Sequence, residues 1–235
     1  MKISSRSDIA PFYVMEVMKA AAAREMRGDG VLHLEVGQPS TPAPQGVLAA
    51  AEAALKNERL GYTDAHGLPL LRRRIVDHYS DRYSVDLEED QIAVTVGASG
   101  GFVLATLAAF NEGDRVAMTE PGYSAYRNIL RALGIEVVDI PVGPSTRFNP
   151  TPAALEAALP LDGLVTASPS NPTGTILTSS ELVDLVTFCN GHEIRMIADE
   201  IYHGITYGSE SAPTAVSHST DAVVVQSFSK YFSMT

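Results

Sequence analysis

Lys230 is the side chain of this sequence best placed to act as an amine nucleophile. Lysine is scarce in the chain, and the nearest lysine before Lys230 in the sequence is Lys56. The surrounding segment, Ser-Phe-Ser-Lys-Tyr-Phe-Ser, is uncharged and partly aromatic. Such neighbours would remove water from the ammonium group and favour a reactive amine. A solvated lysine on a surface loop is the alternative interpretation.

A carboxylate, an amide and two phenols could complete a site with this amine. Asp199 follows the run Ile-Arg-Met-Ile-Ala, so its charge emerges at the end of a buried strand, which is costly unless a cation pairs with it. A helix N-cap is its alternative role. Asn171 lies between two prolines that would stiffen the loop and aim the amide at a ligand, although asparagine is also a common turn residue. Tyr123 and Tyr202 are candidate ligand contacts or ordinary half-buried tyrosines.

The segment Gly97-Ala98-Ser99-Gly100-Gly101 offers small residues immediately before a predicted helix. The free N–H groups and the dipole of a helix start suit a phosphate group. The segment does not match the G-x-G-x-x-G fingerprint or the P-loop pattern, and glycines at such a turn are often only good turn residues. The glycine segment is therefore a phosphate site only if the rest of the chain supports one.

These residues must be positioned by strands that alternate with helices. Short β-branched runs predict strands over residues 92–96, 115–118, 136–140, 164–167, 194–198 and 222–225. Helical patterns predict helices over residues 45–56, 68–83, 102–110, 123–133, 152–159 and 181–190. Apolar residues recur at helical spacing at Ile9, Phe12, Met15, Met18 and Ala22, which predicts a first helix. Packing against the rest of the protein is sufficient to explain this apolar stripe. From about residue 90 the alternation indicates an α/β fold, with a mostly parallel sheet between helices.

Each polar cluster begins where a predicted strand ends. The glycine segment follows the strand at 92–96, Tyr123 follows 115–118, Asn171 follows 164–167, Asp199 follows 194–198 and Lys230 follows 222–225. Ligands of open α/β sheets bind at the carboxyl ends of the strands. The sequence therefore predicts one pocket that all five clusters share.

Composition limits the classes of partner. The chain has 235 residues and a net charge of −11, which does not suit a protein that binds a phosphate backbone, so we expect no nucleic acid. The single cysteine, Cys189, excludes a disulfide scaffold and fits a reducing compartment, so we expect a cytoplasmic protein. The first residues lack the apolar region of a signal peptide, and glycines divide the longest uncharged run, so we expect no membrane span.

Three motifs together resemble the signature series of class I/II aminotransferases, the fold-type I enzymes that depend on pyridoxal phosphate, of which aspartate aminotransferase is an example. They are Asn171-Pro172-Thr173-Gly174, Asp199-Glu200-Ile201-Tyr202 and Ser227-Phe228-Ser229-Lys230. The resemblance extends from Gly37-Gln38-Pro39 to these motifs and so covers essentially the whole chain. It implies the cofactor pyridoxal 5′-phosphate, no metal, and an amino acid and a 2-oxo acid as substrates.

The resemblance also implies a role for each residue around the pyridine ring. Lys230 would carry the cofactor as an aldimine and later move a proton between the substrate and the cofactor. Asp199 would keep the pyridine nitrogen protonated, which makes the ring an electron sink. Asn171 and Tyr202 would bind the ring oxygen, and Tyr123 would stack on the ring face.

The remaining contacts implied by the resemblance concern the phosphate, the substrate and a second subunit. The amides of Ala98 and Ser99, together with the hydroxyls of Ser227 and Ser229, would hold the phosphate. Gly37 would meet the substrate through its backbone. Tyr62 resembles the tyrosine that reaches the phosphate of the neighbouring subunit, which implies a homodimer.

Residues before about Arg59 are helix and loop with many alanines and prolines, which indicates an arm or cap packed on the sheet domain, and the rest of the domain organisation follows from the resemblance. Residues 1–58 are expected to form an amino-terminal arm and part of a small or cap region, and residues 59–235 a cofactor-binding large domain that is incomplete at its carboxy end. The sequence ends at Thr235, before the arginine that usually follows the lysine and before the family's carboxy-terminal small domain, so the small domain is expected to be missing. Gly100-Gly101 departs from the family pattern and predicts a weaker helix start.

The function expected from the sequence is transfer of an amino group from an amino acid to a 2-oxo acid. A pyridoxal-phosphate lyase or decarboxylase of the same fold would share nearly all these residues. A non-catalytic aminotransferase-like domain that binds a ligand is a further alternative. A doubly wound NAD-binding domain is disfavoured because its glycine fingerprint is absent.

Overall fold

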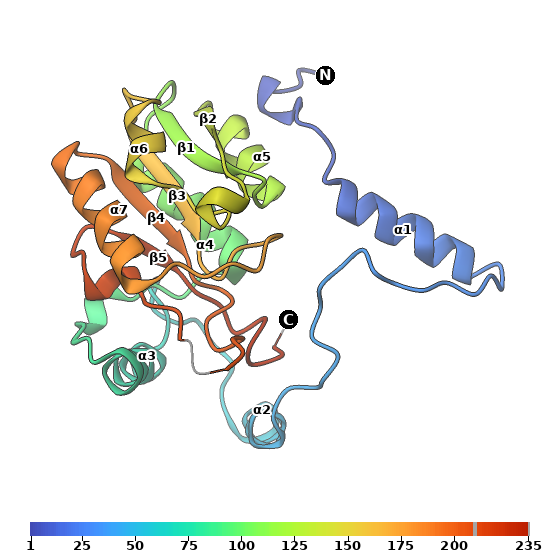
Figure 1. Cartoon of the computed structure of the whole chain (residues 1–235). Coiled ribbons are helices and arrows are strands. Elements are labelled where there is room, and N and C mark those ends of the chain that lie inside the picture. Colours follow the sequence, from blue (N-terminus) through green and yellow to red (C-terminus); the bar gives the residue numbers. More distant parts are fainter. Residues whose placement is uncertain (209–210, 235) are drawn as a thin grey trace.

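The computed structural model describes residues 1–208 and 211–234, and its centre is a five-stranded sheet (Figure 1). The strand order is β2-β1-β3-β4-β5, and all four pairings are parallel. The strands are β1 (Arg115–Glu120), β2 (Glu136–Pro141), β3 (Gly163–Ala167), β4 (Arg195–Asp199) and β5 (Val223–Val225). The predicted α/β class with a parallel sheet is therefore confirmed.

Strand register brings three strand ends to one level. Ala167 at the end of β3 pairs with Asp199 at the end of β4, and Asp199 pairs with Val225 at the end of β5. The loops that leave these strands therefore start side by side at the carboxyl edge of the sheet. This edge is where open α/β sheets bind ligands.

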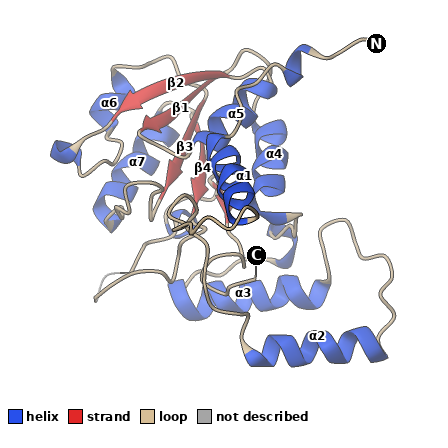
Figure 2. Cartoon of the chain, turned by 90° about the vertical axis from the view of Figure 1, so that its right-hand side faces the viewer, coloured by secondary structure: helices blue, strands red, loops and turns tan. Residues whose placement is uncertain are grey.

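Helices cover both faces of the sheet, as Figure 2 shows for α4 and α5 on one face and α6 and α7 on the other. The helices are α1 (Tyr13–Glu25), α2 (Gln45–Asn57), α3 (Pro69–Tyr83), α4 (Gly97–Ala109), α5 (Ser124–Ala132), α6 (Pro152–Glu156) and α7 (Ser179–Gly191). Alternate strand residues supply the two cores. Leu164 and Met196 pack with α7, whereas Val165 and Ile197 pack on the face of α4 and α5.

Local sequence signals set two of the helix starts. Thr151 caps α6 by accepting a hydrogen bond from the N–H of Ala154, with a proline at the first helical position. Thr178 and Glu181 form a capping box at the start of α7. Both helices begin where the capping residues in the sequence predict. Capping residues work locally, because they satisfy the free N–H groups of the first turn without help from the rest of the fold.

The strand predicted over residues 92–96 is wrong for the described structure, in which no strand is assigned there. A strand exists only with a ladder partner, and the N–H of Val94 bonds instead to the carbonyl of His66 at 3.0 Å. The helix predicted over 102–110 starts earlier, at Gly97. Glycine lowers helix propensity but is tolerated in a first turn whose N–H groups are free in any case.

The amino-terminal segment lies largely outside the sheet and its layers (Figure 1). Neither α1 nor α2 contains a buried residue. Packing explains the stripe at Phe12, which lies edge-on against Tyr123 at 5.9 Å. It does not explain Ile9 and Met15, which are 45% and 48% exposed in this chain, so the expectation is wrong for those two residues. In the described part of the chain no helix is both long and apolar enough to span a bilayer.

Candidate active site

The candidate site lies at the carboxyl edge of the sheet, where loops after β3 and β4 meet. Asn171 follows β3 and Tyr202 follows β4, and the amide of Asn171 donates a hydrogen bond of 3.2 Å to the Tyr202 hydroxyl. Both side chains are partly buried. The predicted convergence of these two residues is therefore present in the structure.

Asp199 is the buried acid of the site, with 4% of its surface exposed. One carboxylate oxygen accepts a hydrogen bond of 2.6 Å from the Tyr126 hydroxyl, and the other accepts a hydrogen bond of 3.1 Å from the N–H of Ile201. Burial raises the pKa of Asp199, while these two hydrogen bonds and the positive charge of Lys230 oppose the rise. The carboxyl group is thus held firmly and would gain from a cation beside it.

Lys230 lies in the loop after β5 and is half-buried. Its Nζ donates to the carbonyl oxygen of Gly37 at 3.3 Å. The same nitrogen lies 5.8 Å from the centre of the Tyr202 ring. The structure therefore brings Lys230, Gly37 and Tyr202 together, although Gly37 and Lys230 are far apart in the sequence.

Tyr123 lies at the start of α5, beside Asp199 and Tyr202. Its ring meets Tyr126 edge-on at 5.1 Å. Burial raises the pKa of Tyr123, and the nearby Tyr202 and Asp199 raise it further. The phenol stays protonated at neutral pH and presents an aromatic surface rather than a charge.

A helix start without a side-chain cap lies at the amino end of α4. Val96 precedes the helix and makes no side-chain cap, so the first-turn amides of Ala98 and Ser99 remain available to a ligand. In the loop after β5, the Ser227 hydroxyl donates to the Ser229 hydroxyl at 2.9 Å and accepts from the Ser229 N–H at 3.1 Å. These groups offer amide and hydroxyl donors of the kind that bind phosphate.

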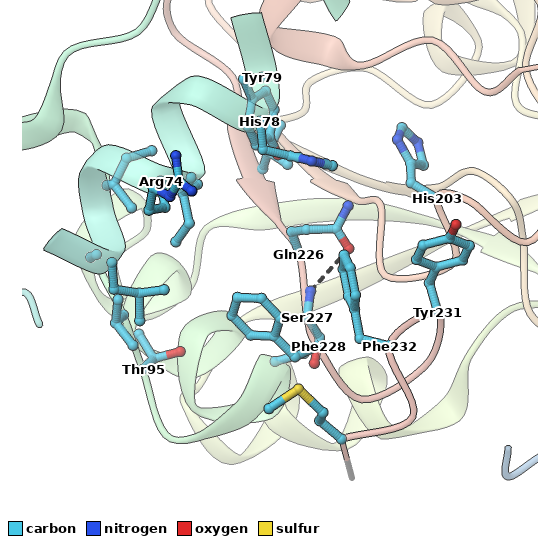
Figure 3. Close-up of a pocket in the computed structure, with 18 of the residues that line it drawn as sticks. Arg74, His78, Tyr79, Thr95, His203, Gln226, Ser227, Phe228, Tyr231 and Phe232 are labelled. Carbon is cyan, nitrogen blue, oxygen red and sulfur yellow. Dashed lines mark hydrogen bonds between the residues drawn. The ribbon is translucent and has the colours of Figure 1, made fainter. Parts of the chain in front are cut away.

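A cavity of about 520 Å³ adjoins this edge (Figure 3). It is lined by α3, by residues 91–95 and by the end of the chain, including Phe228, Tyr231 and Phe232. Ala98 and Ser227 line it, whereas Asp199 and Lys230 do not. The cavity therefore includes part of the expected phosphate site.

Tyr62 contrasts with the other predicted residues because its side chain is fully exposed. It belongs to the amino-terminal region that lies outside the sheet layers. Its predicted contact would be made to a second subunit.

The family model described as "Aminotransferase class I and II" matches residues 29–235. The chain belongs to the class I and II aminotransferases. The resemblance on the three signature motifs is thereby confirmed at the level of the family.

Curated and solved aminotransferases give the same result. The chain is 50% identical over its whole length to a valine–pyruvate aminotransferase of Mycobacterium tuberculosis, of which it covers 61%. It superposes with a TM-score of 0.94 on the crystal structure of an aminotransferase from M. tuberculosis, at 49% identity, with all of this chain and 61% of the other covered. The aspartate aminotransferase of Thermus thermophilus with maleate gives a TM-score of 0.95 at 25% identity, with 100% and 62% covered. The chain thus spans about 61% of the length of these two M. tuberculosis relatives.

Two features of this candidate site were missed by sequence reasoning. Tyr126 binds Asp199 directly, and its position in the first turn of α5, three residues after the N-cap Tyr123, is the signal that could have suggested it. Glu200 and His203 are both buried beside the site. The sequence around Glu200 and His203 does not indicate that they are buried beside the site, because the hydrogen-bond partner of His203 is Tyr83 on α3, far away in the sequence.

Proposed function

We propose that the protein is a pyridoxal-phosphate-dependent aminotransferase that moves an amino group from an amino acid to a 2-oxo acid. The observation that carries the proposal is the placement of the Lys230 amine 5.8 Å from the centre of the Tyr202 ring, at the sheet edge where the buried carboxyl group of Asp199 also lies. An amine next to a buried acid suits a cofactor that has both an aldehyde and a pyridine nitrogen.

The donor set fits this cofactor, which is the one used by the family. The buried carboxylate of Asp199 would hold a protonated pyridine nitrogen. Asn171 and Tyr202, already joined by a hydrogen bond, would bind the ring oxygen, and Tyr123 would cover a ring face. When bound, pyridoxal phosphate supplies a ring that stabilises negative charge at the amino acid Cα.

A second set of donors would hold the phosphate. The amides of Ala98 and Ser99 at the uncapped start of α4, with the hydroxyls of Ser227 and Ser229, would bind it. Lys230 would bind the cofactor and would carry the proton at the substrate Cα. Gly37, whose carbonyl already bonds Lys230, would meet the substrate through its backbone.

Similarity to a valine–pyruvate aminotransferase favours valine as amino donor and pyruvate as acceptor. The support is 50% identity across the whole chain. We further propose a homodimer in which Tyr62 reaches the partner's phosphate, because its side chain is fully exposed. A cytoplasmic location is proposed from the buried free thiol of Cys189.

The test is product formation together with cofactor attachment. The protein is supplied with pyridoxal phosphate, valine and pyruvate, and alanine and 2-oxoisovalerate are measured; borohydride reduction and peptide mapping then locate the cofactor. We expect equal amounts of both products and a label on Lys230. Lys56→Ala is the matched control, because Lys56 is an exposed lysine paired with Glu52. Carbon dioxide release without alanine would identify a decarboxylase, and a label on another lysine would refute the role of Lys230.

A further inference from the structure

The turn after β4 carries two kinds of side chain. Asp199 and Tyr202 belong to the candidate site. Glu200 and His203, which alternate with them, are buried with 3% and 6% of their surface exposed. The two site residues are thus presented by a turn whose other side chains are fixed inside the molecule.

Glu200 anchors the first half of this turn. Its N–H donates to the carbonyl of Val225 in β5 at 2.9 Å. Its side-chain Oε1 accepts a hydrogen bond of 2.7 Å from the N–H of Ala215. The beginning of the turn is therefore tied to the neighbouring strand and to the segment near residue 215.

His203 anchors the second half of the turn to a different element. Its Nδ1 shares a hydrogen bond of 2.7 Å with the hydroxyl of Tyr83, the last residue of α3. The two ring centres are 5.7 Å apart. Figure 3 shows His203 on the wall of the cavity that α3 also lines. One hydrogen bond thus connects α3 to the residue that follows Tyr202.

The charges around His203 decide which contact holds its ring. Arg82 and Tyr83 face it from α3, with Tyr79 on the same helix, and Glu200 Oε2 lies 3.5 Å from Nδ1. Burial and the charge of Arg82 lower the pKa of His203 to about 4, although a backbone hydrogen bond at Ser168 opposes this. Burial raises the pKa of Glu200 to about 8. The 2.7 Å contact between Nδ1 and the Tyr83 hydroxyl is a hydrogen bond, whereas Glu200 Oε2 lies 3.5 Å away, so Tyr83 is the partner that holds the ring.

We propose that His203 is a positioning residue, which fixes, through its hydrogen bond to Tyr83, the turn that presents Asp199 and Tyr202 to the cofactor. This inference rests on the proposed function. His203 acts through its neighbour Tyr202 and touches no reacting atom. Without the bond to Tyr83, the turn would lose its connection to α3, and the Tyr202 hydroxyl would depend on its hydrogen bond to Asn171 alone to stay in position for the ring oxygen of the cofactor.

The test removes the bond from either side. Tyr83→Phe deletes only the hydroxyl, and His203→Leu keeps the bulk without a polar atom. His203→Asn keeps a donor and an acceptor near the position of Nδ1 and should restore part of the bond. Tyr79→Phe is the matched control, because Tyr79 is a buried tyrosine of the same helix with its ring 5.4 Å from that of Tyr83.

The readouts are the dissociation constant of pyridoxal phosphate and the pH midpoint at which the visible band of the bound cofactor changes. Thermal unfolding confirms that each variant is folded. We expect Tyr83→Phe and His203→Leu to weaken binding about three- to tenfold, the scale of one hydrogen bond, and to move the pH midpoint in the same direction. His203→Asn should lie nearer the wild type, and Tyr79→Phe should match it. The double variant should lose little more than the worse single variant.

Several outcomes would overturn the inference. A folded Tyr83→Phe protein with wild-type affinity and midpoint would exclude it, and so would an equal change in Tyr79→Phe. If His203→Leu does not fold, Tyr83→Phe and His203→Asn decide. If the wild-type protein shows no visible band that depends on Lys230, the proposed function fails and this inference fails with it. A normal wild-type band with unchanged variants refutes the role of His203 alone.

Discussion

Tyr126 donates a hydrogen bond of 2.6 Å to Asp199, the acid at the end of β4. Each residue has only 4% of its surface exposed. The ring of Tyr126 also stacks on Phe102 of α4, with 4.1 Å between the centroids. The carboxylate that would face the cofactor is therefore oriented by a phenol whose own ring is fixed in the core between the sheet and α4.

Tyr126→Phe should weaken pyridoxal phosphate binding and raise the pKa of Asp199, since the phenol helps to stabilise the ionised carboxylate. A hydrogen bond to a charged acceptor contributes about 1.5–3 kcal/mol, which corresponds to roughly a ten- to hundredfold loss of affinity. Asp199 must be ionised to hold a pyridine N–H. On acidification, the variant should therefore lose the cofactor at a higher pH than the wild type does. Cofactor titrations across pH measure both effects.

The control for this change is Tyr207→Phe, because the Tyr207 side chain is 90% exposed. It should bind the cofactor as the wild type does. Equal affinity and equal pH dependence in Tyr126→Phe and the wild type would show that the phenol does not act on Asp199.

Asp199→Asn should retain part of the cofactor and lose most of the transamination. The amide keeps the shape of the side chain and removes the charge that would hold the pyridine nitrogen protonated. We expect kcat to decrease by about a hundredfold or more, the scale of lost electrostatic stabilisation in an active site. Asp199→Glu should also be poor, because an added methylene displaces the carboxylate.

Steady-state kinetics with Asp184→Asn as the control would check this result. Asp184 is an exposed acid on α7, and its variant should have unchanged kcat. Near-normal turnover in Asp199→Asn would contradict the role given to the carboxylate.

Tyr62→Phe should weaken cofactor retention if each site of a homodimer takes a phosphate contact from the other subunit. The loss of one hydrogen bond to a charged acceptor corresponds to about 1.5–3 kcal/mol. Subunit symmetry makes the exchange reciprocal. Mixing Tyr62→Ala with Lys230→Ala should therefore yield heterodimers in which one of the two sites has both residues, and activity should return.

Light scattering and subunit exchange measure the two parts of this prediction. A monomeric mass for the active protein would exclude the shared site. So would a failure to regain activity after exchange has been verified.

Glu200 and His203 should give opposite pH dependences of stability. Burial raises the pKa of Glu200 from 4.5 to about 8, so its contribution to stability is complete below pH 4.5 and is lost as the pH rises to about 8. Burial lowers the pKa of His203 from 6.5 to about 4, so its contribution is complete above pH 6.5 and is lost as the pH falls to about 4. The two effects oppose each other between about pH 4.5 and 6.5.

Between pH 6.5 and 8 only Glu200 of this pair changes its contribution. In the wild type, the free energy of unfolding should therefore decrease as the pH rises over this interval. In Glu200→Gln this decrease should be smaller. Urea denaturation at a series of fixed pH values measures the slopes. Glu52→Gln, with the Glu52 side chain 69% exposed, serves as the control. Parallel curves for Glu200→Gln and the wild type would contradict the prediction.

The sequence alone determined the alternation of strands and helices and the edge at which the site lies. These features depend on short-range patterns: the β-branched run before Asp199, the capping box of Thr178 and Glu181, and the polar motif that follows each buried strand. The extended segment at 92–96 shows the limit of such patterns, because a strand also needs a partner that the local sequence does not name.

Only the tertiary structure decided which distant side chains meet. Tyr126 reaches Asp199 across 73 positions, Tyr83 reaches His203 across 120, and Lys230 reaches Gly37 across 193. The pattern of a helix or strand fixes which face is apolar, but the strand register and the packing of α3 and α5 fix which residues of separate elements come within hydrogen-bond distance. Local sequence patterns therefore place the candidate site residues at the sheet edge, and long-range packing determines which side chains orient them.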